Sequence, residues 1–281
     1  MSRPLPAREG ISPRKVMLSG QVPESPAYVA GEAGDSPFPV GSPLPPGLVL
    51  ERPVPAWFHP EVPQEPEIPF SHEVLYVDED LIVVDKPHFL PSTTNGRIIR
   101  ETVQTRLRVE FREDDIVVLH RLDRLTAGVL VCSRRPATRG LYQRLFQDRA
   151  VAKTYLARVV RGPMVGEQPR VVRLGMRKER GRRQVRVDAA ATPTETTVRR
   201  VGEDVVELSP LTGHTHQLRV LLNHLGTPIV GDDTYPVDRG LSLHDFSSPL
   251  HLLATEISFP DPQSGRIRTF RSRRRLPAKM R

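Results

Sequence analysis

Cysteine is almost absent from this 281-residue chain, in which Cys132 is the single thiol. One thiol cannot form a disulfide within the chain, and it cannot supply a cysteine cluster for zinc. No apolar run approaches the roughly 20 residues of a membrane helix. The N-terminus also lacks the charged-then-apolar layout of a signal peptide. We therefore expect a soluble, cytoplasmic protein without membrane contact.

Lysine is scarce as well. Only five of the 41 basic residues are lysine, and the others are arginine. The formal net charge is +8. Arginine pairs with phosphate through a fixed fork of donors, so this bias points toward phosphate-rich partners, although genomic base composition can also raise arginine usage. The length allows one large domain or two small ones.

Charge and proline are unevenly distributed along the chain. Residues 1–70 hold 16 of the 29 prolines, with five basic and eight acidic residues, a net charge of −3 that leaves +11 for the remainder. Proline interrupts helices and removes a donor from any sheet. We expect residues 1–70 to be a proline-rich extension, partly ordered at most, that could lie over the main domain through Trp57 and Phe58. Residues 71–281 would form that domain.

The main domain has more predicted strands than helices. Helices are predicted at 136–149, where Pro136 can begin the first turn and Leu141, Tyr142, Leu145 and Phe146 form an apolar face, and at 216–225 before Gly226. Because the elements do not alternate regularly, we predict an α+β fold with a largely antiparallel mixed sheet flanked by helices and loops. Runs typical of strands occupy 73–77, 81–84, 116–119, 129–132, 153–160, 184–187, 195–201, 204–208 and 251–259.

The segment His120–Gly128 is the most informative stretch of the chain. It places Asp123 among Arg121, Arg124 and His120, on a polar loop between two apolar runs. Loops held by rigid elements often carry reactive groups, and the flanking cations favour an ionised carboxylate. Asp123 is thus a candidate nucleophile or base for a polyanionic substrate, although structural aspartates paired with arginine are common.

A second candidate site is Leu211–Arg219. Thr215 could cap the helix that begins at His216, and Arg219 would lie in its first turn, where a helix N-terminus attracts anions. His214 and His216, with His224 further on, could instead be metal ligands. No cysteine or acidic residue completes such a set nearby, so hydrogen-bonding histidines are favoured and no metal is expected.

Two further features fit a nucleic-acid partner. Lys153 and Tyr155 project from one face of a strand, where a ring beside a cation suits base stacking, although an isolated pair of this kind is more often structural. Residues 173–186 contain seven basic residues in a loop or hairpin, and residues 266–281 contain eight. Together they favour contact with a polyanion backbone over sequence readout.

In this order, the motifs resemble the RluA-type pseudouridine synthases, which isomerise uridine to pseudouridine in ribosomal or transfer RNA. The resemblance runs from about Val74 to Phe270. It rests on Asp78–Pro87, His120–Asp123 with Thr126 and Gly128, Lys153-x-Tyr155, Thr212–Arg219, and Gly226–Asp232 with Tyr235.

The resemblance implies the pseudouridine synthase fold and a role for each matching residue. Asp123 would be the catalytic carboxylate, and Arg121 would fill the gap left by the flipped nucleotide. Tyr155 would pack on the uracil, and Arg219 would pair with the carboxylate. No cofactor is implied, the partner is RNA (rRNA, tRNA or both), and we expect a monomer without a protein partner.

The chain departs from the family pattern at several positions. These are His214, Leu125, Ala127, Leu253 and Pro91–Gly96, and an S4-type RNA-binding domain is not evident in residues 1–70. Activity with an altered substrate-contact surface is therefore expected. Two other functions stay open: a catalytically silent RNA-binding or ribosome-assembly factor on the same fold, which the retained Asp123 disfavours, and a histidine-metal hydrolase.

Overall fold

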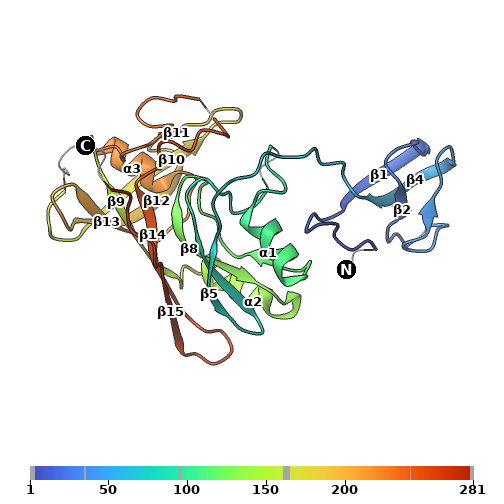
Figure 1. Ribbon diagram of the computed structural model, residues 1–281, viewed down its shortest axis with the longest axis horizontal. Coiled ribbons are helices and arrows are strands. Elements are labelled where there is room, and N and C mark those ends of the chain that lie inside the picture. Colours follow the sequence, from blue (N-terminus) through green and yellow to red (C-terminus); the bar gives the residue numbers. More distant parts are fainter. Residues whose placement is uncertain (1–3, 35, 95–96, 161–164, 241, 279–281) are drawn as a thin grey trace. The chain divides into compact units, whose positions relative to one another are not determined.

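The computed structural model describes residues 4–34, 36–94, 97–160, 165–240 and 242–278. They form two compact units (Figure 1). The smaller unit contains the residues up to 65 together with 93–116, and the larger contains 66–92 and the residues from 117 onward. The sequence suggests a single boundary at residue 70, whereas the structure also assigns the internal segment 93–116 to the N-terminal unit. No helix in the described part of the chain is long and apolar enough to span a bilayer.

The larger unit is built on one mixed sheet. Its described strands are β5 (Glu73–Val77), β6 (Leu81–Lys86), β7 (Val117–Val118), β8 (Ala127–Ser133), β9 (Ala152–Arg158), β10 (Arg170–Lys178), β11 (Val185–Val187), β12 (Thr192–Arg200), β13 (Val205–Pro210), β14 (Leu252–Pro260) and β15 (Ile267–Arg271). They follow the order β11-β10-β12-β13-β9-β14-β8-β6-β5, with β15 beside β14 and β7 beside β8. The pairs are antiparallel except for β14 and β8, which run parallel. The expected α+β fold is confirmed.

Two described helices accompany this sheet. Helix α2 (Pro136–Gln147) packs on β8 (Figure 1), and the hydroxyl of its buried Tyr142 donates to Asp261 at 3.2 Å. Leu145 and Phe146 pack on the same core, but Leu141 is 40% exposed, so the apolar face is narrower than the sequence predicts. Helix α3 (Gln217–His224) ends before Gly226, as expected, and presents its buried side to the sheet.

The smaller unit differs from the expected extended segment, because it contains a four-stranded antiparallel sheet. Its strands are β1 (Arg14–Gln21), β2 (Tyr28–Ala30), β3 (Pro43–Leu44) and β4 (Val49–Phe58), in the order β1-β4-β2-β3. Two of the three strand prolines lie where a missing donor is tolerated, because Pro43 is on the edge strand and Pro53 is where the β1–β4 register shifts, whereas Pro55 lies within β4 opposite Met17. Trp57 and Phe58 belong to this sheet, and the Phe58 ring packs on Tyr28.

Helix α1 (Val103–Phe111) is an element that the sequence did not predict. Thr102 caps it by accepting a hydrogen bond from the amide of Thr105 at 3.1 Å. The buried Arg108 donates to the carbonyl oxygens of Ile116 and Gly10, which fixes the N-terminal segment within the smaller unit. Its amphipathic pattern is weak, since arginines alternate with apolar residues along it, so periodicity gave little signal.

Gly128 gives the first prediction, because β8 and β14 approach each other most closely there. Its φ is +117°, and a Cβ at this position would overlap the backbone of Ala254. We expect Gly128→Ala to lower the free energy of unfolding by about 2–4 kcal/mol, from backbone strain and overpacking.

The matched control is Gly140→Ala in α2, where a Cβ meets nothing. Alanine in a helix interior should instead stabilise by about 0.5–1 kcal/mol. Urea denaturation followed by circular dichroism measures both effects. Equal stability of the two variants would contradict the predicted close approach.

Candidate functional site

The loop that carries Asp123 lies between β7 and β8, and its backbone is held by the segment 86–92. The ammonium of the fully buried Lys86 donates to the carbonyl oxygen of Arg124 at 3.2 Å and to two carbonyl oxygens of its own segment. Ser92 bonds both the amide and the carbonyl of Leu122. His88 bonds the carbonyl oxygen of Leu125 at 2.6 Å. The Asp123 side chain remains 35% exposed, so a fixed loop presents an accessible carboxylate.

Arg219 faces Asp123 from α3. Its side chain is only 4% exposed, and its Nη1 lies 3.7 Å from Oδ2 of Asp123. The remaining nitrogens hold a second acidic group: Nε and Nη2 bond Asp232 at 2.9 and 2.5 Å, and Nη2 also bonds Asp233 at 2.8 Å. The expected pairing with Asp123 is therefore a contact of one nitrogen, whereas the fork of Arg219 is bound to Asp232.

The charge of this arginine is stabilised by its partners. Burial opposes the charged form of Arg219, but the hydrogen bonds and negative charge of Asp232 outweigh that cost and raise its pKa. Asp232 is itself 1% exposed and accepts from the backbone amides of Thr234 and Tyr235 at 2.8 and 2.9 Å. The result is a rigid, buried ion pair with one guanidinium nitrogen left for Asp123.

The N-terminus of α3 is built differently from the predicted cap. His216 occupies the cap position with φ of 55° and no side-chain bond to the helix, so Thr215 is not the cap. The buried side chain of Gln217 instead orders the segment before the helix, because its oxygen accepts from the amide of His214 and the hydroxyl of Thr212. The side-chain nitrogen of Gln217 donates to the hydroxyl of Thr196 on β12 at 2.9 Å. These bonds fix the helix that carries Arg219 against the sheet.

Tyr155 approaches the same carboxylate from β9. Its side chain is 9% exposed, and burial, followed by the negative charge of Asp123, raises its pKa. Asp123, Tyr155 and Arg219 thus meet from a loop, a strand and a helix that are far apart in sequence.

Arg121 is exposed beside Asp123, and within the described residues it has no hydrogen bond or ion pair. Arg124 bonds the carbonyl of Ser242 at 2.9 Å, consistent with a structural role.

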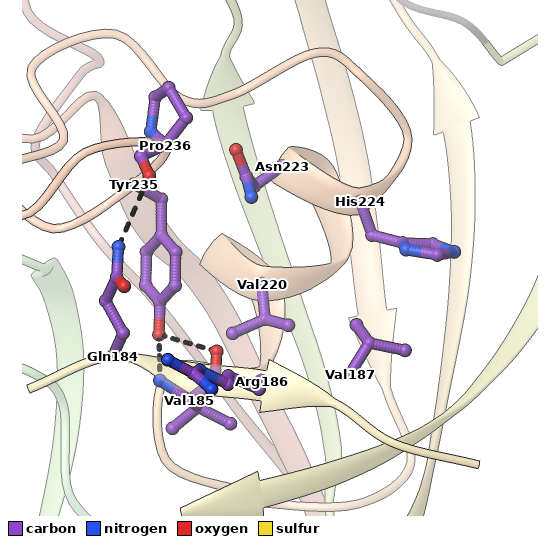
Figure 2. A pocket seen from close by; sticks show the side chains of 9 residues that line it. All are labelled: Gln184, Val185, Arg186, Val187, Val220, Asn223, His224, Tyr235 and Pro236. Atoms are coloured by element: carbon purple, nitrogen blue, oxygen red, sulfur yellow. Dashed lines mark hydrogen bonds between the residues drawn. The ribbon is translucent and has the colours of Figure 1, made fainter. Parts of the chain in front are cut away.

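Two further residues join the site, His216, which the sequence favoured as a hydrogen-bonding histidine, and Tyr235, which belonged to the last matching motif. His216 places Nε2 3.9 Å from Asp123 and bonds the hydroxyl of Tyr235 through Nδ1 at 3.1 Å. Burial lowers the pKa of His216 despite the nearby carboxylate. The Tyr235 ring lies under the Arg219 guanidinium at 5.5 Å and forms a wall of a cavity of about 240 Å³ between β11 and α3 (Figure 2). The motif Gly226–Asp232 with Tyr235 was the sequence signal for this group.

The other histidines do not converge on a metal. In the described residues, no group of three His, Cys, Asp or Glu side chains is placed to hold an ion. His224 is exposed on α3. His120 lies beneath the aspartate loop, where its ring stacks on Phe146 and its Nε2 accepts from the amide of Val131 at 3.1 Å.

The basic clusters are ordered to different degrees. Residues 173–186 lie in the hairpin of β10 and β11, as one of the two sequence alternatives predicts. The C-terminal cluster begins with β15, and the segment after it is fixed to the fully buried Asp85. That carboxylate accepts from the hydroxyl of Ser272 and the amide of Arg273. Part of the described C-terminal cluster is therefore held against Asp85 and has a structural role.

Comparison with known proteins agrees with this geometry. The family model for RNA pseudouridylate synthase matches residues 80–224. The dual-specificity RNA pseudouridine synthase RluA of Vibrio cholerae is 32% identical over 217 residues, which cover 74% of this chain and 83% of that protein. Human pseudouridylate synthase RPUSD2 is 36% identical over 174 residues, 58% of this chain but only 30% of that protein.

A solved structure has the same fold. Human RNA Pseudouridylate Synthase Domain Containing 1 aligns with a TM-score of 0.58 and 27% identity, covering 74% of this chain and 86% of that one. The chain belongs to the RNA pseudouridylate synthase family. Members of this family are isomerases, and the resemblance inferred from the motifs is confirmed.

His120 gives a prediction of pH dependence. Burial, with a smaller contribution from the positive charge of Lys153, lowers its pKa from 6.5 to about 3. The unfolded chain therefore binds this proton first as the pH falls. The stability that His120 contributes is complete above pH 6.5 and is lost as the pH falls toward 3, by at most about 1.4 kcal/mol per pH unit. We expect His120→Gln to flatten the fall in unfolding free energy between about pH 6.5 and 4.5.

Urea denaturation at a series of pH values measures this slope. His224→Gln is the control, because it removes an exposed histidine. If His120→Gln retained the wild-type slope, the neutral histidine beneath the loop would be ruled out as its source.

Proposed function

We propose that this protein isomerises uridine to pseudouridine in RNA, and that Asp123 is the carboxylate that acts on the nucleotide. The observation that supports this most strongly is the meeting of Asp123, Tyr155 and Arg219 around one partly open point. A carboxylate, an aromatic ring and a buried cation are the groups that such a reaction needs.

The proposed reaction needs few catalytic groups. Uracil is joined to ribose C1′ through N1, and the reaction breaks this bond, turns the ring and forms a bond from C5 to C1′. C5 loses a proton and N1 gains one, so atoms and electrons balance without a redox or group-transfer co-reactant. Asp123 would either attack as a nucleophile or move a proton. Arg219, fixed by Asp232, would stabilise the carboxylate in either role.

The neighbouring residues suit a base taken out of its stack. An enzyme that works on a base inside folded RNA must flip it into a pocket and shield it from water. The ring of Tyr155, which is 9% exposed and lies near Asp123, would pack on the uracil. The exposed Arg121 would occupy the gap left in the RNA, because its side chain has no partner among the described residues.

The substrate that we propose is ribosomal RNA, transfer RNA or both. RluA of Vibrio cholerae is named a dual-specificity enzyme, and a relative in Haemophilus influenzae is named for the ribosomal large subunit. The arginines of the β10–β11 hairpin, among them Arg173 and Arg186 with side chains 72% and 60% exposed, would contact the phosphate backbone.

Asp123→Asn tests the proposed carboxylate directly. The amide keeps the shape of the side chain but can neither attack nor accept a proton, so we expect pseudouridine formation in transcribed RNA to be abolished. RNA affinity should stay within about threefold, because backbone contacts dominate it. Asp245→Asn, in an exposed turn, is the control and should retain full activity.

Full activity of Asp123→Asn would overturn the assignment. An inactive wild-type protein that still binds RNA tightly would instead favour the alternative, a silent RNA-binding factor on this fold.

Tyr155 should act through its ring. We expect Tyr155→Phe to retain most activity and Tyr155→Ala to lose about tenfold or more, since base–aromatic stacking contributes about 1–3 kcal/mol. Single-turnover rates of pseudouridine formation measure the difference. Equal losses in the two variants would mean that the hydroxyl, not the ring, is required.

A further inference from the structure

The hairpin of β10 and β11 is attached to the loop that follows Gly231 through three consecutive residues. Arg183 bonds Asp233 at 2.6 Å and Thr234 at 3.2 Å through Nη2, and its Nη1 bonds Asp238. The guanidinium is 28% exposed, so it is largely enclosed by these partners.

The next two residues of the hairpin continue the attachment. The side chain of Gln184 donates to the carbonyl oxygens of Thr234 and Pro236 at 2.8 and 3.3 Å, and the amide of Val185 donates to the hydroxyl of Tyr235 at 2.7 Å. Figure 2 shows the bond from Gln184 to Pro236 and the bond between Val185 and Tyr235 at the edge of the cavity. The hairpin tip thus cannot shift without moving this loop.

Asp233 connects the attachment to the site. Its Oδ2 accepts from Arg183, while its Oδ1 accepts from Arg219 at 2.8 Å and from Thr234 at 2.7 Å. One carboxylate therefore bridges two guanidinium groups. Burial alone would raise the pKa of Asp233, but the Thr234 bond and the two arginines lower it, so the bridge remains charged.

The other arginines of the tip differ from Arg183. Arg182 is 64% exposed and pairs only with Glu179 within the hairpin, and Arg186 faces the same glutamate at 4.0 Å. Lys178 closes the turn by donating to the carbonyl oxygens of Arg182 and Arg183. The tip is therefore ordered so that one arginine points inward while its neighbours face solvent.

We propose that Arg183 is a positioning residue for the isomerisation: it holds Asp233 and, through it, the guanidinium of Arg219 in the orientation that faces Asp123. This inference rests on the proposed function. Arg183 acts through Asp233, because its own nitrogens are taken by the loop. It would make the RNA-facing hairpin a supporting part of the catalytic geometry.

Arg183→Ala tests the proposal on the full-length protein. We expect kcat to fall by about ten- to a hundredfold with KM changed less than threefold, since small misplacements near the chemistry cost that much. Arg183→Lys can still pair with Asp233 but cannot also reach Thr234 and Asp238, so it should recover part of kcat. Arg199→Ala removes the same charge from β12, outside the basic clusters, where the side chain pairs with Glu207, and it should leave kcat unchanged.

A double mutant separates a positioning role of Arg183 from a direct contact between Arg183 and RNA. In Asp233→Asn, whose own kcat should be reduced, adding Arg183→Ala should have little further effect, because residues that act through one another are not additive. A rise in KM at constant kcat, or an equal further loss of kcat in the Asp233→Asn background, would overturn the proposal.

A measurement that does not depend on catalytic activity tests this inference separately from the proposed function. The Nε–H resonance of Arg219, identified by its loss in Arg219→Lys, reports the bond to Asp232 by NMR. It should shift in Arg183→Ala and stay in place in Arg199→Ala, while circular dichroism shows that both variants are folded. If the wild type formed no pseudouridine, the proposed function would fail, and an unchanged resonance in Arg183→Ala would overturn the positioning role separately.

Discussion

A buried guanidinium cannot stay unpaired, and this requirement organises the site. Placing the Arg219 side chain at 4% exposure without a partner would cost several kcal/mol, so its fork is bound to Asp232 and shared with Asp233. The orientation of α3 and the conformation of the loop after Gly231 both follow from this pairing. The nitrogen that remains is the one that faces Asp123, which makes a structural ion pair part of the candidate site.

The loop that carries Asp123 is held in place by hydrogen bonds from neighbouring side chains. Lys86 and His88 bind its carbonyl groups from one segment, and the neutral ring of His120 accepts an amide from β8. Burial lowers the pKa of each of these three side chains, so they act here as donors and acceptors to the backbone. A fixed loop with a partly exposed carboxylate is well suited to act on a nucleotide that enters from outside.

Much of this could be predicted from the sequence where local pattern decides structure. The strands around Asp123 and the helix that begins at Pro136 follow from apolar runs and turn residues, whereas the approach of Tyr155 and Arg219 to Asp123 was implied only by the family resemblance. The bridging role of Asp233 could not be predicted, because only the fold brings it between Arg183 and Arg219. The cap predicted at Thr215 was wrong because His216, with a left-handed backbone conformation, occupies the cap position and makes no side-chain bond to the helix. The N-terminal sheet was missed because its strands contain Pro43, Pro53 and Pro55, and only the strand pairing shows that the first two lie at an edge and at a register shift.

The most direct test of the central claim is a crystal structure of the protein with a short RNA stem-loop that carries 5-fluorouridine at the target position. Fluorine cannot leave C5 as a proton does, so the rearranged nucleotide should be retained. The account predicts a flipped base against the ring of Tyr155, with ribose C1′ next to a carboxylate oxygen of Asp123 and Arg219 still bound to Asp232. A nucleotide held elsewhere, or an Asp123 carboxylate turned away from the sugar, would contradict it.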